Sequence, residues 1–226
     1  MDSYRTEDEQ LEAIKRWWRE NGRSTVIAVL LAVGIGLGWQ AWQQRRETRA
    51  AEASQRYQAL LEALDAERGA GGGAAAADPR QLGDELRAAH GGSVYAPLAA
   101  LHLAQLAVAD GELERAEEQL RWALDAAEGD LEDVVQLRLA RVLAARGDPA
   151  AALAMLGDEA GVALTPARDL ARGDVLLDAG RDAEALAAYR RAAAALQGSP
   201  ALPRSLQQKI DFLSPQVPDA GDAEAG

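Results

Sequence analysis

The sequence predicts an all-α protein in which a single N-terminal transmembrane helix is followed by a solenoid of helical repeats. Three observations support this fold class. Residues 24–44 contain no charged side chain, alanine and leucine dominate the rest of the chain, and glycines recur at intervals typical of stacked helix pairs. Runs of Val, Ile and Thr, which are typical of strands, are missing outside residues 24–44.

Residues 1–23, before the uncharged stretch, have the pattern of a short amphipathic helix. Between Thr6 and Asn21, apolar side chains recur at helical spacing, at Leu11, Ile14, Trp17 and Trp18. We expect this helix to end at Asn21-Gly22, a suitable C-cap, and to lie along the membrane surface. The alternative is a disordered tail in which the spacing arose by chance.

Residues 24–44 are long enough to cross a bilayer once. An α-helix of this length spans roughly 31 Å, which matches the hydrocarbon core of a membrane. Trp39 and Trp42 lie near its end, and Trp17 and Trp18 lie just before its start, where amphipathic rings prefer to be. A cleaved secretory signal is the alternative, but the preceding segment is long for a signal and the apolar character continues to Trp42.

Small residues are spaced along this helix so that a second transmembrane helix could approach closely. They are Ala28, Ala32, Gly34, Gly36 and Gly38. The orientation of the helix is only weakly encoded, because five Lys and Arg residues precede the uncharged stretch and four Arg residues follow it closely. This small excess favours a cytoplasmic location for residues 1–23.

Residues 45–213 are expected to form the repeat domain, beginning with a divergent helix pair made of residues 45–66 and 79–90. The segment from Gly69 to Ala77 separates these two helices. It lacks the following Lys and Ser or Thr of a phosphate-binding loop, so we interpret it as a flexible connector.

Three further helix pairs align on the turn glycines Gly111, Gly147 and Gly180. Their spacings of 36 and 33 residues are close to the 34 of tetratricopeptide repeats. The residues at fixed offsets also match: Ala104, Ala140 and Gly173 seven before the glycine, Ala116, Ala152 and Ala185 five after it, and Leu120, Leu156 and Tyr189 nine after it. The alternative is chance agreement in an alanine-rich chain. The pattern predicts a tetratricopeptide-like helical-repeat solenoid.

The end of the solenoid needs a cap, because a terminal repeat would otherwise expose its apolar face. We expect a last helix from Leu202 to Leu213 to provide it through Leu206, Ile210 and either Phe212 or Leu213. Residues 214–226 are expected to be a disordered tail.

Tetratricopeptide geometry places the first helix of each pair along a concave groove. Within that groove we expect a polar stripe able to hydrogen-bond a peptide backbone, formed by Gln105, Arg141 and Asp174. The apolar contacts of the groove are expected from Leu98, Val108, Val134 and Leu177. The leucines ten residues before each turn glycine, Leu101, Leu137 and Leu170, are assigned to the core. A merely solvated row of side chains is the alternative for the polar stripe.

Composition argues against several classes of function. The net charge of −12 is unsuited to binding nucleic acid, and the absence of cysteine excludes disulfides and thiol chemistry. The two histidines, His90 and His102, do not belong to a cluster with metal-ligand spacing, and no serine lies in a nucleophile-elbow pattern. We therefore expect no enzyme activity, no metal and no cofactor.

Several blocks of this sequence together resemble the bacterial YfgM family over nearly the whole chain. They are YRTEDEQLEAIKRWWRENGR, GWQAW, YAPLAAL, and RLARVLAARGD followed by ARGDVLLDAGRDAEALAAYRRA. The resemblance implies a single-pass inner-membrane protein with a cytoplasmic N-terminus and a tetratricopeptide-like domain in the periplasm. It also implies an ancillary subunit of the SecYEG translocon, with the periplasmic chaperone PpiD as partner.

Two functions without catalysis compete at this point. In the first, a membrane-anchored, chaperone-like adaptor presents its groove to a partner protein or to a chain emerging from the translocon. In the second, the protein is a structural scaffold that self-associates in an envelope or cell-division complex.

Overall fold

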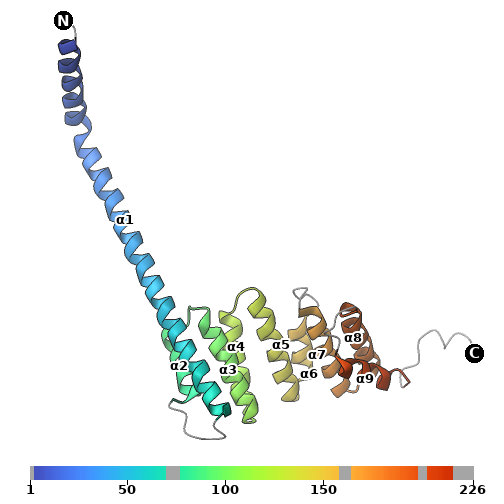
Figure 1. The fold of residues 1–226 in the computed structure, drawn as a ribbon. Coiled ribbons are helices and arrows are strands. Elements are labelled where there is room, and N and C mark those ends of the chain that lie inside the picture. The colour runs from blue at the N-terminus through green and yellow to red at the C-terminus, as the bar shows by residue number, and fades with distance from the viewer. Residues whose placement is uncertain (1–2, 70–76, 158–163, 198–202, 216–226) are drawn as a thin grey trace, which may run out of the picture. The chain divides into compact units, whose positions relative to one another are not determined.

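All regular secondary structure in the described part of the chain is helical (Figure 1). The structure is a computed structural model that describes residues 3–69, 77–157, 164–197 and 203–215. Its helices are α1 (Ser3–Gly69), α2 (Pro79–His90), α3 (Tyr95–Ala109), α4 (Leu113–Ala126), α5 (Asp130–Ala145), α6 (Pro149–Leu156), α7 (Thr165–Asp178), α8 (Asp182–Ala195) and α9 (Arg204–Leu213). The all-α fold class is confirmed.

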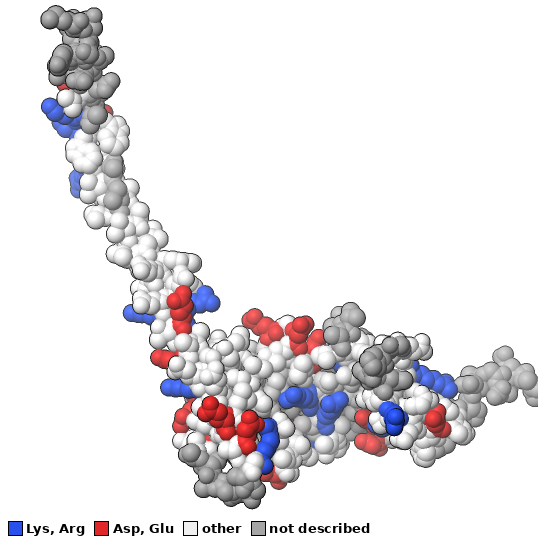
Figure 2. Space-filling model, viewed as in Figure 1, with Lys and Arg blue, Asp and Glu red and all other residues white. Residues whose placement is uncertain are grey.

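The chain divides into two compact units, Met1–Glu52 and Ala53–Gly226. The first unit is the greater part of α1, and it contains a helical stretch that is long and apolar enough to cross a membrane. Its large apolar side chains are exposed, among them Leu30, Ile35 and Trp39. Figure 2 shows this stretch as a column without charged side chains along its middle. These properties agree with the expected single transmembrane helix.

The expected helix end at Asn21-Gly22 is wrong, because α1 continues through both residues. Gly22 has no positive φ, which a C-cap glycine commonly needs. A Cβ built at Gly22 would lie 3.3 Å from the indole of Trp18, so the ring covers the glycine one helical turn later. The Ser24 hydroxyl also donates a hydrogen bond of 2.8 Å to the Asn21 carbonyl. The structure does not describe the side chains of residues 3–10, which include Thr6, or that of Ile14.

The second unit begins with the last part of α1, which packs beside α2 and α3 (Figure 1). Leu60 and Leu64 of α1 share an apolar cluster with Leu86 of α2 and Ala99 of α3. The divergent first helix pair is therefore present, and its packed part begins at Ala53 rather than at residue 45. Most of the glycine-rich connector, residues 70–76, lies outside the described residues.

The three predicted repeat pairs are α3 with α4, α5 with α6, and α7 with α8. Their turn glycines, Gly111, Gly147 and Gly180, have φ values of 78°, 86° and 70°, which only glycine adopts readily. In each turn the residue after the glycine donates a backbone hydrogen bond, 2.8 to 3.0 Å long, to the carbonyl five residues earlier. This is the Schellman arrangement, and it explains why glycine recurs at these positions.

The small residue seven before each glycine allows the two helices of a pair to pack closely. Ala104 and Ala140 are buried, as are the leucines at the matching positions of the following helices, Leu120 and Leu156. In the last pair the residues are Gly173 and Tyr189, and a Cβ on Gly173 would lie 2.4 Å from Cε1 of the tyrosine ring. The larger ring therefore requires the smaller partner.

Helix α9 covers the last repeat. Leu206 and Leu213 are fully buried in a cluster with α8 residues, whereas Phe212 is 64% exposed. The sequence did not distinguish Phe212 from Leu213 as the apolar contact, and the structure shows that it is Leu213. The helix begins at Arg204. The expected start at Leu202 and residues 216–226 of the expected tail lie outside the described residues.

Candidate partner-binding groove

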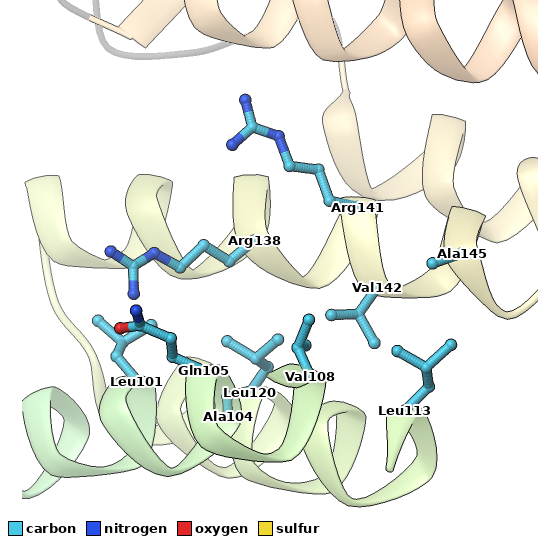
Figure 3. A pocket seen from close by; sticks show the side chains of 10 residues that line it. All are labelled: Leu101, Ala104, Gln105, Val108, Leu113, Leu120, Arg138, Arg141, Val142 and Ala145. Carbon is cyan, nitrogen blue, oxygen red and sulfur yellow. The ribbon is translucent and has the colours of Figure 1, made fainter. Parts of the chain in front are cut away.

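An open groove of about 340 Å³ lies between the first two repeats (Figure 3). Helix α3 forms one side of it, α5 forms the other, and α4 contributes Leu113 and Leu120. Most of the lining is apolar: Leu101, Ala104, Val108, Leu113, Leu120, Val142 and Ala145. Three longer polar side chains, Gln105, Arg138 and Arg141, complete the lining. An apolar floor with a few polar groups is typical of a ligand-binding groove.

Three of the expected groove residues meet here. Gln105 and Val108 of α3 and Arg141 of α5 line the groove, and all three are exposed. Leu101, assigned to the core, is 5% exposed and also lines the groove floor. Leu137 is buried, as expected, and Leu170 is partly buried against the C-terminal cluster.

The other expected groove residues lie elsewhere. Leu98 and Val134 are partly buried against the apolar cluster that contains Leu101, Leu120 and Leu139. Leu177 is partly buried against the cluster that α8 and α9 share. None of the three lines this groove. Their side chains contribute mainly to packing between helices.

Asp174, which has the same offset from its turn glycine as Gln105 and Arg141, is engaged within the last repeat. The hydroxyl of Tyr189 donates a hydrogen bond of 2.7 Å to its carboxylate, and Nζ of Lys209 on α9 lies 2.5 Å from the same oxygen. Burial, followed by the hydrogen bond to Asp174, raises the pKa of Tyr189 far above its ordinary value, so this hydroxyl remains a donor. Through its ion pair with Lys209, Asp174 therefore links α9 to the third repeat.

Arg138 is the charged groove residue that sequence reasoning missed; Leu113, Val142 and Ala145 were not predicted either. It stands nine residues before Gly147, an offset that was not assigned to the inner face. Figure 3 shows its guanidinium beside the amide of Gln105, whereas the Arg141 side chain extends from α5 away from α3. The sequence feature that could have predicted it is the three-residue spacing of Arg138 and Arg141, which places both on neighbouring parts of one helix surface.

A polar contact joins α3 to the end of α1 near this groove. The Tyr57 hydroxyl lies 3.1 Å from Nε2 of His102, and the two rings lie 6.0 Å apart. Burial, followed by the nearby Arg138 and Arg68 guanidiniums, lowers the pKa of His102 below its ordinary value of 6.5. The neutral imidazole therefore predominates in the folded protein at neutral pH.

In the described part of the chain, no group of three or more His, Cys, Asp and Glu side chains could hold a metal ion.

The five small residues of the transmembrane helix are exposed, and a Cβ at Gly34, Gly36 or Gly38 would meet no atom within 4 Å. That surface is open in the isolated chain.

Comparison with known proteins places the chain in a family. The family model described as a tetratricopeptide repeat-like domain matches residues 15–215. The "Ancillary SecYEG translocon subunit" of Escherichia coli is 35% identical over 95% of this chain and 100% of the relative. Proteins of the same name from Haemophilus influenzae and Aggregatibacter actinomycetemcomitans are 27% and 31% identical, over 82% of this chain and 88% of each relative. No solved structure matches the chain significantly.

The matched region includes the apolar helix, the three glycine-aligned repeats and α9. The chain therefore belongs to the YfgM family of ancillary SecYEG translocon subunits, with a tetratricopeptide repeat-like domain.

Proposed function

We propose that this protein is a membrane-anchored, chaperone-like adaptor at the SecYEG translocon. One observation carries the proposal: the Escherichia coli relative named as an ancillary translocon subunit is matched over its full length, so anchor and repeats are shared together. The apolar N-terminal helix and the translocon-associated relatives fit a single-pass protein of the inner membrane. The N-terminus lies in the cytoplasm and the repeat domain in the periplasm.

The repeat domain supplies the binding surface and the anchor supplies its location. Confining the domain to the membrane raises its effective concentration toward any membrane partner without a new contact. The groove lined by Gln105, Val108, Arg138 and Arg141 receives a segment of PpiD or of a chain emerging from the translocon. The domain acts by binding that segment and carries out no chemical step.

Photocrosslinking from inside the groove tests this function. A photoreactive phenylalanine analogue replaces Gln105 in the full-length protein, and in a control it replaces the exposed Glu118 of α4, which does not line the groove. In irradiated native membranes we expect crosslinks to translocon subunits or PpiD from position 105 and far fewer from position 118. Crosslinks from neither position would contradict the proposal.

A self-associating scaffold is the second candidate. The observation in its favour is the open surface of small residues at Gly34, Gly36 and Gly38, which allows close approach of a second transmembrane helix. The same crosslinking experiment separates the two functions. Contacts between copies of this chain, without translocon contacts, would favour the scaffold.

Orientation is tested separately, using the absence of natural cysteine in the sequence. Single cysteines are introduced at two exposed sites, Ser205→Cys on α9 and Glu20→Cys before the apolar stretch. A membrane-impermeant maleimide added to spheroplasts should label the cysteine at 205 and reach the one at 20 only after the inner membrane is opened. The reverse pattern would contradict a periplasmic repeat domain.

A further inference from the structure

We propose that the groove between the first two repeats selects a partner segment in which an acidic side chain accompanies apolar side chains. The inference rests on the proposed function, because it specifies the chemistry of the segment that the groove receives. Two observations support it. Two arginines of the groove form no ion pair with any described residue, and the groove lining contains no acidic residue.

The arginines of α2 to α8 and of the turns between them mostly form ion pairs or hydrogen bonds with other residues. Those with an ion pair to a described carboxylate are Arg80, Arg87, Arg115, Arg121, Arg146, Arg168, Arg181 and Arg191. Arg138 and Arg141 differ, since neither has an ion pair or a side-chain hydrogen bond to any other residue that the structure describes. Both are exposed and both line the same groove.

The unpaired state of these two arginines is notable in so acidic a chain. With a net charge of −12, the 36 acidic side chains of this chain outnumber its 24 Lys and Arg side chains. The groove lining instead contains no Asp or Glu. The two guanidiniums therefore create a local positive potential on a molecule whose overall field repels anions.

The position of Arg138 fits recognition of a carboxylate. Its guanidinium lies beside the amide of Gln105, directly above the apolar floor that includes Leu101 (Figure 3). A guanidinium can donate two parallel hydrogen bonds to one carboxylate, and such charge-assisted bonds are roughly twice as strong as neutral ones. Val108, which is 46% exposed, offers contact area to a neighbouring apolar side chain of the same segment.

Two matched peptides provide the test. Both are twelve residues long, acetylated and amidated so that no terminal charge remains, and fluorescently labelled. One carries leucines with glutamates between them, and the other has glutamine in place of every glutamate. Binding to the full-length protein in lipid nanodiscs is measured by fluorescence anisotropy at low salt. We expect the glutamate peptide to bind about tenfold more tightly, with the difference shrinking as salt is added.

The double variant Arg138→Gln/Arg141→Gln should bind both peptides equally, at the level of the glutamine peptide. The control variant Arg56→Gln/Arg204→Gln removes the same charge from exposed positions outside the groove, and it should keep the tenfold preference. Circular dichroism checks that each variant retains its helices.

Equal binding of the two peptides by the natural protein, binding of neither, or a preference that survives in Arg138→Gln/Arg141→Gln would each overturn the inference. These results leave the proposed function standing if crosslinks to the translocon form from position 105. Loss of those crosslinks, with the peptide preference intact, would instead reject the function and retain the acidic specificity.

Discussion

The first two repeats and the third repeat use the same sequence positions in different ways. Six residues before the turn glycine, Gln105 and Arg141 are exposed and line an open groove. Asp174 has the same offset in the third repeat, yet it binds Tyr189 and Lys209 and helps to hold α9. Equal spacing therefore produces a binding surface in one part of the solenoid and a closed end in the other.

The difference shows that a repeat position acquires its role from its neighbours. Helix α9 follows the third repeat and covers its apolar residues, which would otherwise be exposed to water. Asp174 meets this added helix, whereas Gln105 faces the open space before α5. Substitutions in the two regions should therefore affect stability to different degrees.

The largest effect is expected where α9 closes the third repeat. Leu213→Ala should lower the free energy of unfolding by about 3 kcal/mol, because it leaves a cavity beside a fully buried cluster. The adjacent change Phe212→Ala removes a 64% exposed side chain and should alter stability by less than about 0.5 kcal/mol. Urea unfolding of the two variants measures the contrast, and similar losses in both would mean that α9 does not cap the repeat.

The next effect concerns the pair that distinguishes the third repeat, Gly173 with Tyr189. Gly173→Ala places a methyl group against a buried ring and should destabilise the protein by about 2 kcal/mol. Without the clash the change would stabilise the helix by up to about 1 kcal/mol, so the sign of the effect is itself decisive.

Adding Tyr189→Leu to Gly173→Ala recreates the alanine and leucine pair of the first two repeats. The double variant should recover stability relative to the sum of the single changes, and a thermal-unfolding cycle of the four proteins gives the coupling. Additive losses would show that these two residues do not determine the close packing of α7 on α8.

A smaller effect is expected at the matching polar positions. Asp174→Ala leaves the buried hydroxyl of Tyr189 without its acceptor and should reduce stability by about 1 kcal/mol. Gln105→Ala and Arg141→Ala change exposed side chains and should each shift stability by less than about 0.5 kcal/mol. Equal losses at all three positions, measured by urea unfolding, would remove the distinction between open and closed repeats.

The smallest effect is a pH dependence at His102. Because its pKa is lowered in the folded protein, the unfolded chain binds the proton at a higher pH. Stability should therefore fall as pH decreases through 6.5, and this contribution should stop changing once pH is below the folded-state pKa. His102→Gln should flatten that part of the stability profile between pH 7 and pH 5, which urea unfolding at each pH measures. A profile unchanged from that of the natural protein would contradict this role of His102.

The fold could be predicted in large part because its signals are local and periodic. Turn glycines with positive φ, small residues at fixed offsets and one uncharged stretch each reflect a requirement within a few helical turns. Three of the ten residues that line the groove were predicted as groove residues in the same way, since Gln105, Val108 and Arg141 follow from the repeat offsets. The offsets did not find Arg138, which lies at a position assigned to neither groove nor core.

The membrane-crossing helix, the three repeat turns, the capping helix and the family can all be recognised in the sequence. Which side chains pair with one another depends instead on how the helices pack. Asp174 and Lys209 are 35 positions apart, and the burial of Leu213 rather than Phe212 depends on how α9 meets α8. Spacing fixes the face of a helix on which a residue lies, but the partner on that face comes from a distant segment and is set by packing.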